Sequence, residues 1–482
     1  MSDIAPWSVA AMAAAMDADR AGPLPEAVTG LSIDTRTIGG GEAFFAIKGD
    51  ARDGHDFVPA ALEAGAGLAV VAKEKRGAFA SDAPLLVVPD VLDALRDLAR
   101  AARERSQAKI IAVTGSVGKT GTKEALRLVL AKSGSTHASA ASYNNHWGVP
   151  LSLARTPASI RYAVFEIGMN HAGEITPLTR LVRPHIAIVT NVEPVHLEYF
   201  GTLEAIADAK AEIFLGLSTD GAAVINRDSP QYDRLARAAK AAGAARIVSF
   251  GEHEQADARL LNVSLKGDSS AVHATILGAE VTYKLGAPGR HIVINSLAVL
   301  AAASLAGADL ALAALALAAL EPPTGRGQRI TLVLPRGGSA LLIDESYNAN
   351  PTSTRAALAL LGHAPAGRHG RRIAVVGDML ELGAAGADLH RSLLDSVLEH
   401  GIDLVFCSGP LMRSLWDALP TERRGGYAES AAALEPQVIA AIRDGDAVMV
   451  KGSLGSRMGP IVKALVRTYS PQEAAAEATA RG

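Results

Sequence analysis

Apolar, β-branched runs alternate with segments of helical periodicity along most of this 482-residue chain. Short apolar runs bounded by glycine or polar turns are expected to be strands, and segments with apolar residues every three or four positions are expected to be helices. In the first part of the chain this pattern predicts strands at 30–34, 43–48, 68–71 and 85–88 and a helix at 58–64. These elements suffice for a small α/β domain, residues 1–89.

The middle of the chain predicts a parallel sheet with crossover helices. A helix at 91–105 leads into a strand at 109–114, and further strands are expected at 162–167, 185–191, 222–226 and 246–250. Three short alternating segments within 260–285 indicate a small antiparallel addition, and Gly-Arg-His at 289–291 opens a long Ala-rich helix. We expect these elements to form a central domain, residues 90–320.

The segment Glu-Pro-Pro-Thr-Gly-Arg-Gly at 321–327 predicts a domain boundary. After it, strands are expected at 340–344, 372–377, 404–408 and 447–451, and helices at 352–361, 389–400, 431–442 and 460–466. This alternation predicts a C-terminal Rossmann-like α/β domain, residues 321–482. A G-x-G-x-x-G fingerprint is missing from it, which disfavours dinucleotide binding.

The strongest chemical signal is the stretch Thr-Gly-Ser-Val-Gly-Lys-Thr-Gly at 114–121. It lies between a predicted strand and a predicted helix, where glycines let backbone N–H groups turn toward a phosphate and the helix N-terminus adds positive charge. Lys119 adds a full charge, and Thr120 offers a hydroxyl to a magnesium ion. Only two residues separate Gly115 from Gly118, so the loop is a compact variant of the common phosphate loop.

The position of other polar residues in the predicted sheet indicates which of them can contribute to a binding site. Glu166 and Asn191 end strands on the edge that carries the phosphate loop, so they can converge there. Spacing alone does not assign a role to His196 or Lys210. In the first domain polar side chains stand on turns and would suit an anionic ligand such as a diphosphate, although surface turn chemistry is the alternative. These residues are Asp34, Thr35, Arg36, Lys48 and His55.

Composition narrows the class of protein. A net charge of −3 and a pI of about 6.5 give no basic stripe, so nucleic acid is not an expected partner. The single cysteine, Cys407, excludes an intramolecular disulfide framework and fits a reducing cytoplasm. The longest apolar run, at 310–320, is too short to span a bilayer, so we expect a buried helix there and no membrane insertion.

Taken together, these motifs resemble those of the Mur ligase family of ATP-dependent peptide-forming enzymes, over nearly the whole chain to about Met458. The motifs that carry the resemblance are the phosphate loop at 114–120, Tyr-Asn-Asn-His-Trp-Gly-Val-Pro at 143–150, Glu-Ile-Gly-Met-Asn at 166–170, Asn-Val-Glu-Pro-Val-His-Leu-Glu at 191–198, Gly-Arg-His at 289–291 with Asn295, Asp-Glu-Ser-Tyr-Asn-Ala-Asn-Pro at 344–351 and Gly-Asp-Met-Leu-Glu-Leu-Gly at 377–383.

The resemblance implies a three-domain α/β ligase. The first domain would hold the UDP end of a substrate, the central one would bind ATP, and the last would close over both and bring the incoming amine. Within the family, the motifs are most similar to those of enzymes whose substrates are UDP-MurNAc-tripeptide and D-alanyl-D-alanine. The implied cofactors are ATP and Mg²⁺, and the chain carries no signal for oligomers, so a monomer is expected.

The resemblance also implies roles for individual residues. Thr120, Glu166 and His196 would surround magnesium, together with Lys210 as a carbamate formed with CO₂. Asn144 and Asn145 would face the tripeptide, and Tyr347, Asn348 and Asn350 would meet the dipeptide. His291 and Asn295 match adenine contacts, and Arg326 and Asp344 match γ-phosphate and ribose contacts. The implied ATP-binding set is Gly115, Ser116, Val117, Gly118, Lys119, Thr120, Gly121, His291, Asn295, Arg326 and Asp344.

Two departures and three alternatives accompany this assignment. Gly121 replaces a threonine or serine often found after the loop, and Ile292 replaces the asparagine that usually follows the histidine.

The sister ligase that adds the third amino acid typically carries Asp-Asn-Pro-Arg, which this chain lacks. A folylpolyglutamate synthetase would leave the first domain unexplained, and a nucleotide sensor would not depend on a peptide acceptor. The third residue of the tripeptide, meso-diaminopimelate or lysine, stays open.

Overall fold

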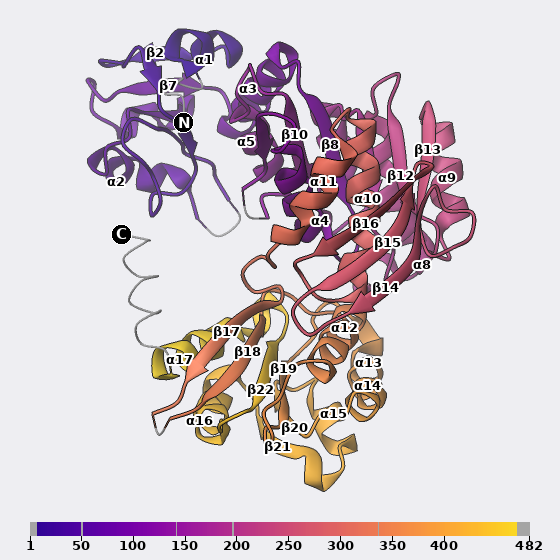
Figure 1. Ribbon diagram of the computed structural model, residues 1–482. Helices are drawn as coiled ribbons and strands as arrows, with labels where there is room; N and C mark the ends of the chain where they lie inside the picture. Colours follow the sequence, from indigo (N-terminus) through magenta and orange to yellow (C-terminus); the bar gives the residue numbers. More distant parts are fainter. Residues whose placement is uncertain (1–6, 50–51, 141, 195–196, 336, 470–482) are drawn as a thin grey trace.

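The chain folds into three successive α/β units, each built on its own large sheet (Figure 1). This computed structural model describes residues 7–49, 52–140, 142–194, 197–335 and 337–469. The sheets lie within residues 19–88, 109–285 and 328–451, so each falls inside one predicted domain. The domain limits at 89 and 320 stay predictions.

The first sheet has the strand order β2-β7-β6-β5-β4, in which β4 to β7 are parallel and β2 is an antiparallel edge. Its elements, with the small ribbon β1-β3, are β1 Trp7–Ser8, α1 Val9–Ala15, β2 Asp19–Ala21, β3 Ala27–Val28, β4 Leu31–Ser32, β5 Ala43–Phe45, α2 Val58–Glu63, β6 Leu68–Ala72 and β7 Leu85–Val88. The predicted strands are present, but β4 and β5 are shorter than expected. Strand β5 ends at Phe45 because the chain turns there and the Ile47 amide donates to the Phe45 carbonyl (2.9 Å).

The central sheet has the order β9-β10-β8-β11-β12-β13-β14-β15-β16. Its strands are β8 Lys109–Thr114, β9 Thr136–Ala138, β10 Tyr162–Glu166, β11 Ile186–Val189, β12 Ala222–Asn226, β13 Arg246–Gly251, β14 Ala258–Leu265, β15 Ser270–Ile276 and β16 Ala279–Leu285. Strands β8 to β14 run parallel, and β15 and β16 extend the sheet as antiparallel strands, as predicted. The strand order reverses at β8, the place where ligands bind in such sheets.

Helices cover both faces of the central sheet because its parallel strands are apolar on both sides. In β8, Ile110 and Ala112 pack against one helical layer, and Ile111 and Val113 against the other. The first layer contains α3 Val91–Arg105, α5 Gly148–Ala154, α6 Ile175–Val182 and α8 Leu203–Ala211; the second contains α4 Lys119–Leu130, α10 Arg290–Leu305 and α11 Leu310–Ala316. The hydrophobic core of the first layer continues into the N-terminal unit through α1 and α3.

The C-terminal sheet has the order β17-β18-β22-β19-β20-β21 and is parallel except for the edge strand β17. Its strands are β17 Gln328–Val333, β18 Ser339–Glu345, β19 Arg372–Gly377, β20 Leu404–Ser408, β21 Arg424–Ala428 and β22 Ala447–Lys451. Its helices are α12 Pro351–Gly362, α13 Gly386–Arg391, α14 Leu393–Glu399, α15 Arg413–Ala418, α16 Ala431–Ala441 and α17 Gly459–Tyr469.

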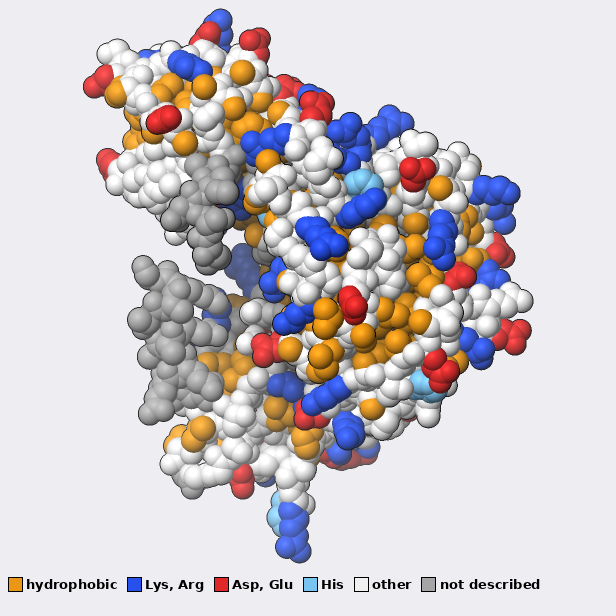
Figure 2. All heavy atoms as spheres, turned by 45° about the horizontal axis from the view of Figure 1, so that its top comes forward, with side chains coloured by type: hydrophobic (Ala, Val, Ile, Leu, Met, Phe, Trp, Pro, Cys, Tyr) orange, Lys and Arg blue, Asp and Glu red, His pale blue; other side chains and the backbone are white. Residues whose placement is uncertain are grey.

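Most predicted elements are confirmed, several of them to the residue, including α3, β8, β12, β19, β20 and β22. The single helix expected at 389–400 is wrong, because the chain forms α13 and α14 with a break at Ser392. No helix among the described residues is long and apolar enough to span a membrane. On the face in Figure 2, both basic and acidic side chains are present.

His55 is buried in the first unit and contacts the backbone and a side chain there. Its Nε2 accepts a hydrogen bond from the Ala72 amide (2.9 Å), and its Nδ1 lies 2.6 Å from Asp53 Oδ1. Replacing His55 by alanine leaves the buried Ala72 amide without an acceptor, so we expect His55→Ala to lower the free energy of unfolding by about 1–3 kcal/mol. Urea titration followed by circular dichroism measures this.

Arg36→Ala is the matched control for that experiment. Its side chain is 85% exposed and pairs only with Asp34 among the described residues, so we expect a change within about 0.5 kcal/mol. If His55→Ala leaves the free energy of unfolding unchanged but weakens binding of the UDP end of the substrate, His55 contributes to ligand binding and not to stability.

Candidate functional site

The phosphate loop joins β8 to α4 and depends on two glycines. Gly115 and Gly118 have φ angles of +147° and +86°, which side chains other than hydrogen rarely allow. A Cβ on Gly115 would lie 1.9 Å from Thr190 Oγ1, and one on Gly118 would lie 2.4 Å from Asn295 Nδ2. Backbone conformation therefore favours glycine at both positions, and lack of space beside Thr190 requires it at Gly115.

The segment after β11 braces this loop. The backbone oxygen of Asn191 accepts from the Ser116 amide (3.1 Å), and Asn191 Oδ1 accepts from the Val117 amide (2.9 Å). Thr190 Oγ1 donates to the Val117 carbonyl (2.7 Å), and Ser116 Oγ donates to the Glu193 carbonyl (3.1 Å). Residues 190–193 thus hold the loop through these four hydrogen bonds before any ligand binds.

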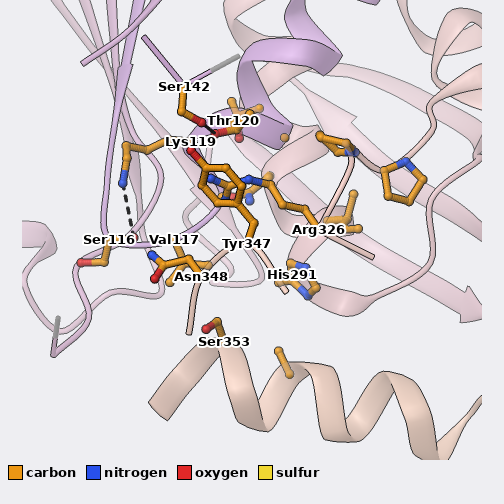
Figure 3. A pocket seen from close by; sticks show the side chains of 18 of the residues that line it. Ser116, Val117, Lys119, Thr120, Ser142, His291, Arg326, Tyr347, Asn348 and Ser353 are labelled. Atoms are coloured by element: carbon orange, nitrogen blue, oxygen red, sulfur yellow. Dashed lines mark hydrogen bonds between the residues drawn. The ribbon is translucent and has the colours of Figure 1, made fainter. Parts of the chain in front are cut away.

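Lys119 folds back over the loop. Its Nζ donates to the Gly115 carbonyl (2.7 Å) and also contacts the Ser116 carbonyl (3.4 Å; Figure 3). Burial lowers the pKa of Lys119, and Arg326 lowers it further while Glu166 opposes the shift. An anion bound in the loop would offer this ammonium a stronger partner than a neutral carbonyl.

Glu166 lies buried at the end of β10, with 1% of its surface exposed. Thr120 Oγ1 donates to its Oε2 (2.8 Å), and Asn144 Nδ2 donates to its Oε1 (2.7 Å). The carboxylate and the hydroxyl present hard oxygen atoms beside the phosphate loop, the kind of ligand that Mg²⁺ prefers. Among the described residues no group of three or more His, Cys, Asp or Glu side chains surrounds this point, and the predicted ligand His196 lies outside them.

Lys210 lies in α8 with 2% of its surface exposed. Burial lowers its pKa well below the usual lysine value, and the charge of Lys119 adds to the shift. No carboxylate of the described residues forms an ion pair with it. The neutral amine is therefore favoured, and this is the form that reacts with CO₂.

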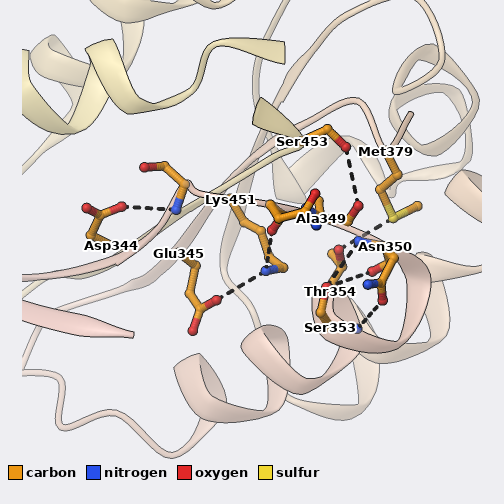
Figure 4. A network of polar contacts seen from close by, with 11 residues as sticks. Asp344, Glu345, Ala349, Asn350, Ser353, Thr354, Met379, Lys451 and Ser453 are labelled. Carbon is orange, nitrogen blue, oxygen red and sulfur yellow. Dashed lines mark hydrogen bonds and ion pairs between the residues drawn. The ribbon is translucent and has the colours of Figure 1, made fainter. Parts of the chain in front are cut away.

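A cavity of about 350 Å³ opens between the phosphate loop and the C-terminal unit. On its C-terminal side, the Arg326 guanidinium stacks 4.2 Å from the centre of the Tyr347 ring (Figure 3). Lys451 pairs with Glu345 (3.1 Å) and donates to the Asn348 carbonyl (3.0 Å; Figure 4). Charged groups from both units thus face one space.

A second cavity of about 550 Å³ adjoins the first, and both are lined by Val117, Asn191, His291 and Asn295. Most of its exposed lining surface is apolar, and its polar and charged lining residues include Glu193, Asn226, Asp228, Ser229, Glu252, Lys266 and Arg290. The His291 side chain is accessible from the cavity, yet its surroundings lower its pKa through loss of solvent, with Lys451 adding to the shift and Glu345 opposing it. A neutral imidazole beside an apolar pocket suits a planar heteroaromatic base.

Several predicted residues have internal partners in this structure. Asn350 caps α12 by accepting from the Ser353 amide (2.8 Å), and Asn145 accepts from the Gly148 amide (2.9 Å). Asp344 is buried and accepts from the Ser346 amide (3.0 Å), and burial raises its pKa. Tyr347, Asn348 and Asn350 line the cavity, whereas Asn145 and Asp344 do not. Ligand contacts at these positions stay predictions.

The predicted residues of the first unit lie apart from both cavities. Arg36 pairs with Asp34 (2.6 Å) on an exposed turn that also carries Thr35, and Lys48 bridges to Asp53 through the backbone. His55 points inward, as described above. The structure therefore does not bring this group to the phosphate loop, and its role in holding an anion stays a prediction.

Other residues of the site were not singled out from the sequence. Glu193 accepts from Thr352 Oγ1 (2.9 Å), which links the loop's brace to α12, and burial raises the pKa of Glu193. Glu345 and Lys451 form the ion pair described above. Their sequence signal was their position at the carboxyl ends of adjacent strands, β18 and β22.

Comparison with known sequences gives three family models that together match most of the chain. They are described as "Mur ligase family, catalytic domain" (residues 27–103), "Mur ligase middle domain" (113–303) and "Mur ligase, glutamate ligase domain" (325–454). Two curated relatives are named UDP-N-acetylmuramoyl-tripeptide--D-alanyl-D-alanine ligase. The one from Rickettsia prowazekii is 32% identical, covering 90% of this chain and 94% of its own length. The one from Escherichia coli is 34% identical, covering 90% and 93%.

Solved structures agree with these relatives. A crystal structure of MurF from Acinetobacter baumannii matches with a TM-score of 0.81 and 28% identity, over 97% of this chain and all of that one. MurF ligase from Thermotoga maritima in complex with ADP matches with a TM-score of 0.74 and 26% identity, over 91% and 97%. The phosphate loop, the carboxylate beside it and the three-sheet architecture thus agree with sequence and structural similarity along nearly the whole chain, and the protein belongs to the Mur ligase family.

Proposed function

We propose that this enzyme joins D-alanyl-D-alanine to UDP-MurNAc-tripeptide at the expense of ATP, forming UDP-MurNAc-pentapeptide, ADP and phosphate for peptidoglycan synthesis. The single observation that carries the proposal is the phosphate loop, in which Lys119 Nζ donates to the Gly115 carbonyl and Thr120 Oγ1 donates to Glu166, in a chain that aligns over 90% of its length with ligases of that name.

The reaction proceeds in two transfers. The C-terminal carboxylate of the tripeptide attacks the γ-phosphorus of ATP, so ADP leaves and an acyl phosphate forms. The neutral amine of the dipeptide then attacks the acyl carbon; the carbon–oxygen bond to phosphate breaks, phosphate leaves and the nitrogen loses a proton. Phosphorylation supplies the leaving group that a free carboxylate lacks.

The chain's own groups support these transfers by binding and orientation. Lys119 moves from the Gly115 carbonyl to the β- and γ-phosphates, where its charge stabilises the transferred phosphoryl oxygens. Arg326 reaches the γ-phosphate from the C-terminal side of the cavity. The second cavity takes the adenine beside His291 and Asn295.

Thr120 and Glu166, with His196 and a carbamate on Lys210, would hold magnesium in this enzyme. The paired hydroxyl and carboxylate beside the loop support that assignment, as does the buried Lys210, whose pKa is lowered by burial. When bound, magnesium neutralises charge on the phosphates. We expect the enzyme to act as a monomer, and the need for ATP supports a cytoplasmic location.

The three sheets also support the proposed domain roles. Residues 1–89 hold the UDP end through Asp34, Thr35, Arg36, Lys48 and His55, residues 90–320 bind ATP, and residues 321–482 bring the dipeptide past Tyr347, Asn348 and Asn350. Asn144 and Asn145 face the tripeptide from the central domain. The exposed arginine and lysine in the first group suit a diphosphate.

ADP release measured with each substrate omitted in turn tests the proposed reaction. We expect ADP and phosphate only when ATP, UDP-MurNAc-tripeptide and D-alanyl-D-alanine are all present, and mass spectrometry should show the pentapeptide product. ATP hydrolysis that is indifferent to both acceptors would support a nucleotide sensor instead.

Removing the loop cation should strongly reduce turnover. Lys119→Ala removes one preorganised charge from the transferred phosphoryl group, so the barrier should rise by about 3 kcal/mol, or roughly 100-fold in kcat. Lys132→Ala, an exposed lysine just after α4, is the matched control and should turn over normally. Near-normal turnover of Lys119→Ala would contradict its assignment.

The carbamate can be observed directly. With ¹³C-labelled bicarbonate, the wild-type enzyme should show a carbamate carbon signal that is absent from Lys210→Gln, because only an uncharged lysine forms this adduct. The far-ultraviolet circular dichroism spectrum serves as the control for folding and should match that of the wild type. An identical signal in both proteins would place the carbamate elsewhere.

A further inference from the structure

A third cavity lies at the opposite edge of the central sheet from the phosphate loop. Its volume is about 380 Å³, and it opens where β8 and β11 begin, whereas the phosphate loop follows the end of β8. Its lining residues come from the end of α3, the end of α6, the start of β11 and the segment after α8: Arg103, Glu104, Ser106, Gln107, Ala108, Arg183, His185, Gly216, Leu217 and Ser218. Neither family motif nor proposed substrate accounts for it.

Two arginines face this cavity without a carboxylate partner. Arg103 is fixed by the chain itself: its Nε donates to the Val182 carbonyl (2.8 Å) and its Nη2 to the Arg183 carbonyl (3.0 Å). Burial lowers the pKa of Arg103, and the like charge of Arg183 lowers it further. In the described part of the chain no ion pair joins either arginine to an acidic group, although Glu104 lies in the lining.

His185 adds a neutral donor to these cations. Its Nδ1 accepts from the Ile110 amide (3.0 Å), so the proton of the neutral ring is on Nε2. Burial lowers the pKa of His185 to about 4, with Lys109 and Arg103 adding to the shift, so the ring is neutral at pH 7. The structure gives no acceptor for this N–H, or for the buried Ser218 Oγ, among the described residues.

We propose that this cavity binds a small oxyanion of the phosphate class, either inorganic phosphate or the phosphate group of a small soluble metabolite. The cavity lining brings Arg103, Arg183, His185 and Ser218 together from four places in the chain. Two cations and neutral donors around one space suit an anion with several acceptor oxygens, and guanidinium groups hydrogen-bond strongly to phosphate. The bound anion removes the repulsion between Arg103 and Arg183. It also ties α3, which follows the first sheet directly, to α6 and β11 of the central unit.

Calorimetric titration with inorganic phosphate, pyrophosphate and glycerol phosphate tests the proposal, with ADP present throughout so that the phosphate loop is occupied by nucleotide. Arg183→Gln should weaken binding of the preferred probe at least about tenfold, because it removes a charge-assisted donor. Arg237→Gln removes the same charge from an exposed site on α9 (Tyr232–Ala241), outside the cavity lining, and should bind like wild type.

Melting temperature gives a second readout on the same proteins. The preferred probe should raise it in wild type and in Arg237→Gln but not in Arg183→Gln, while ADP affinity stays equal in all three. Preference for glycerol phosphate over inorganic phosphate would identify a phosphomonoester as the ligand, and the reverse preference the free ion. Binding that persists unchanged in Arg183→Gln but disappears in Lys119→Ala would overturn the proposal, because the anion would then occupy the phosphate loop.

Discussion

The catalytic centre depends on the close contact between the phosphate loop and the end of β11. A loop that points backbone N–H groups toward an anion leaves its own carbonyls and adjacent amides needing partners, and Asn191 and Thr190 provide them. The contact is so close that no side chain fits at Gly115. Because these bonds are formed within the protein, the loop has its shape before nucleotide arrives, and binding energy is not spent on ordering it.

Near this loop the described basic side chains Lys119, Lys210 and Arg326 outnumber the acidic partner Glu166. Burial lowers the pKa values of Lys119 and Lys210; the charge of Arg326 adds to the shift at Lys119, and the charge of Lys119 adds to the shift at Lys210. Glu166 is the acidic group that offsets the shift at Lys119. Such an arrangement is costly in the free protein and favourable once a polyanion enters. At the opposite end of the strands, where β8 and β11 begin, Arg103 and Arg183 also lie close together without an acidic partner among the described residues. A bound anion would reduce their repulsion as well.

The sequence predicted well wherever local pattern decides structure. The run from β8 through the loop into α4 combines β-branched residues, glycines and a helical period, and each signal is local. Strand β17 was missed because it is an edge strand with a partly exposed, mixed composition that carries no clear alternation. The ion pair of Glu345 with Lys451 spans 106 residues and so could not be found from spacing. His55 and Asn350 show a different limit, since the residue types that bind ligands also cap helices and satisfy buried amides.

One residue connects the loop to the C-terminal unit. The backbone carbonyl of Glu193 accepts from Ser116 in the phosphate loop, and its carboxylate accepts from Thr352 in the first turn of α12. Burial raises the pKa of Glu193, so its charge is costly unless α12 is in place to supply the hydrogen bond and its N-terminal partial charge. A shift of the C-terminal unit therefore acts on the segment that braces the loop. Glu193 thus provides a direct contact between the first turn of α12 and the segment that braces the phosphate loop.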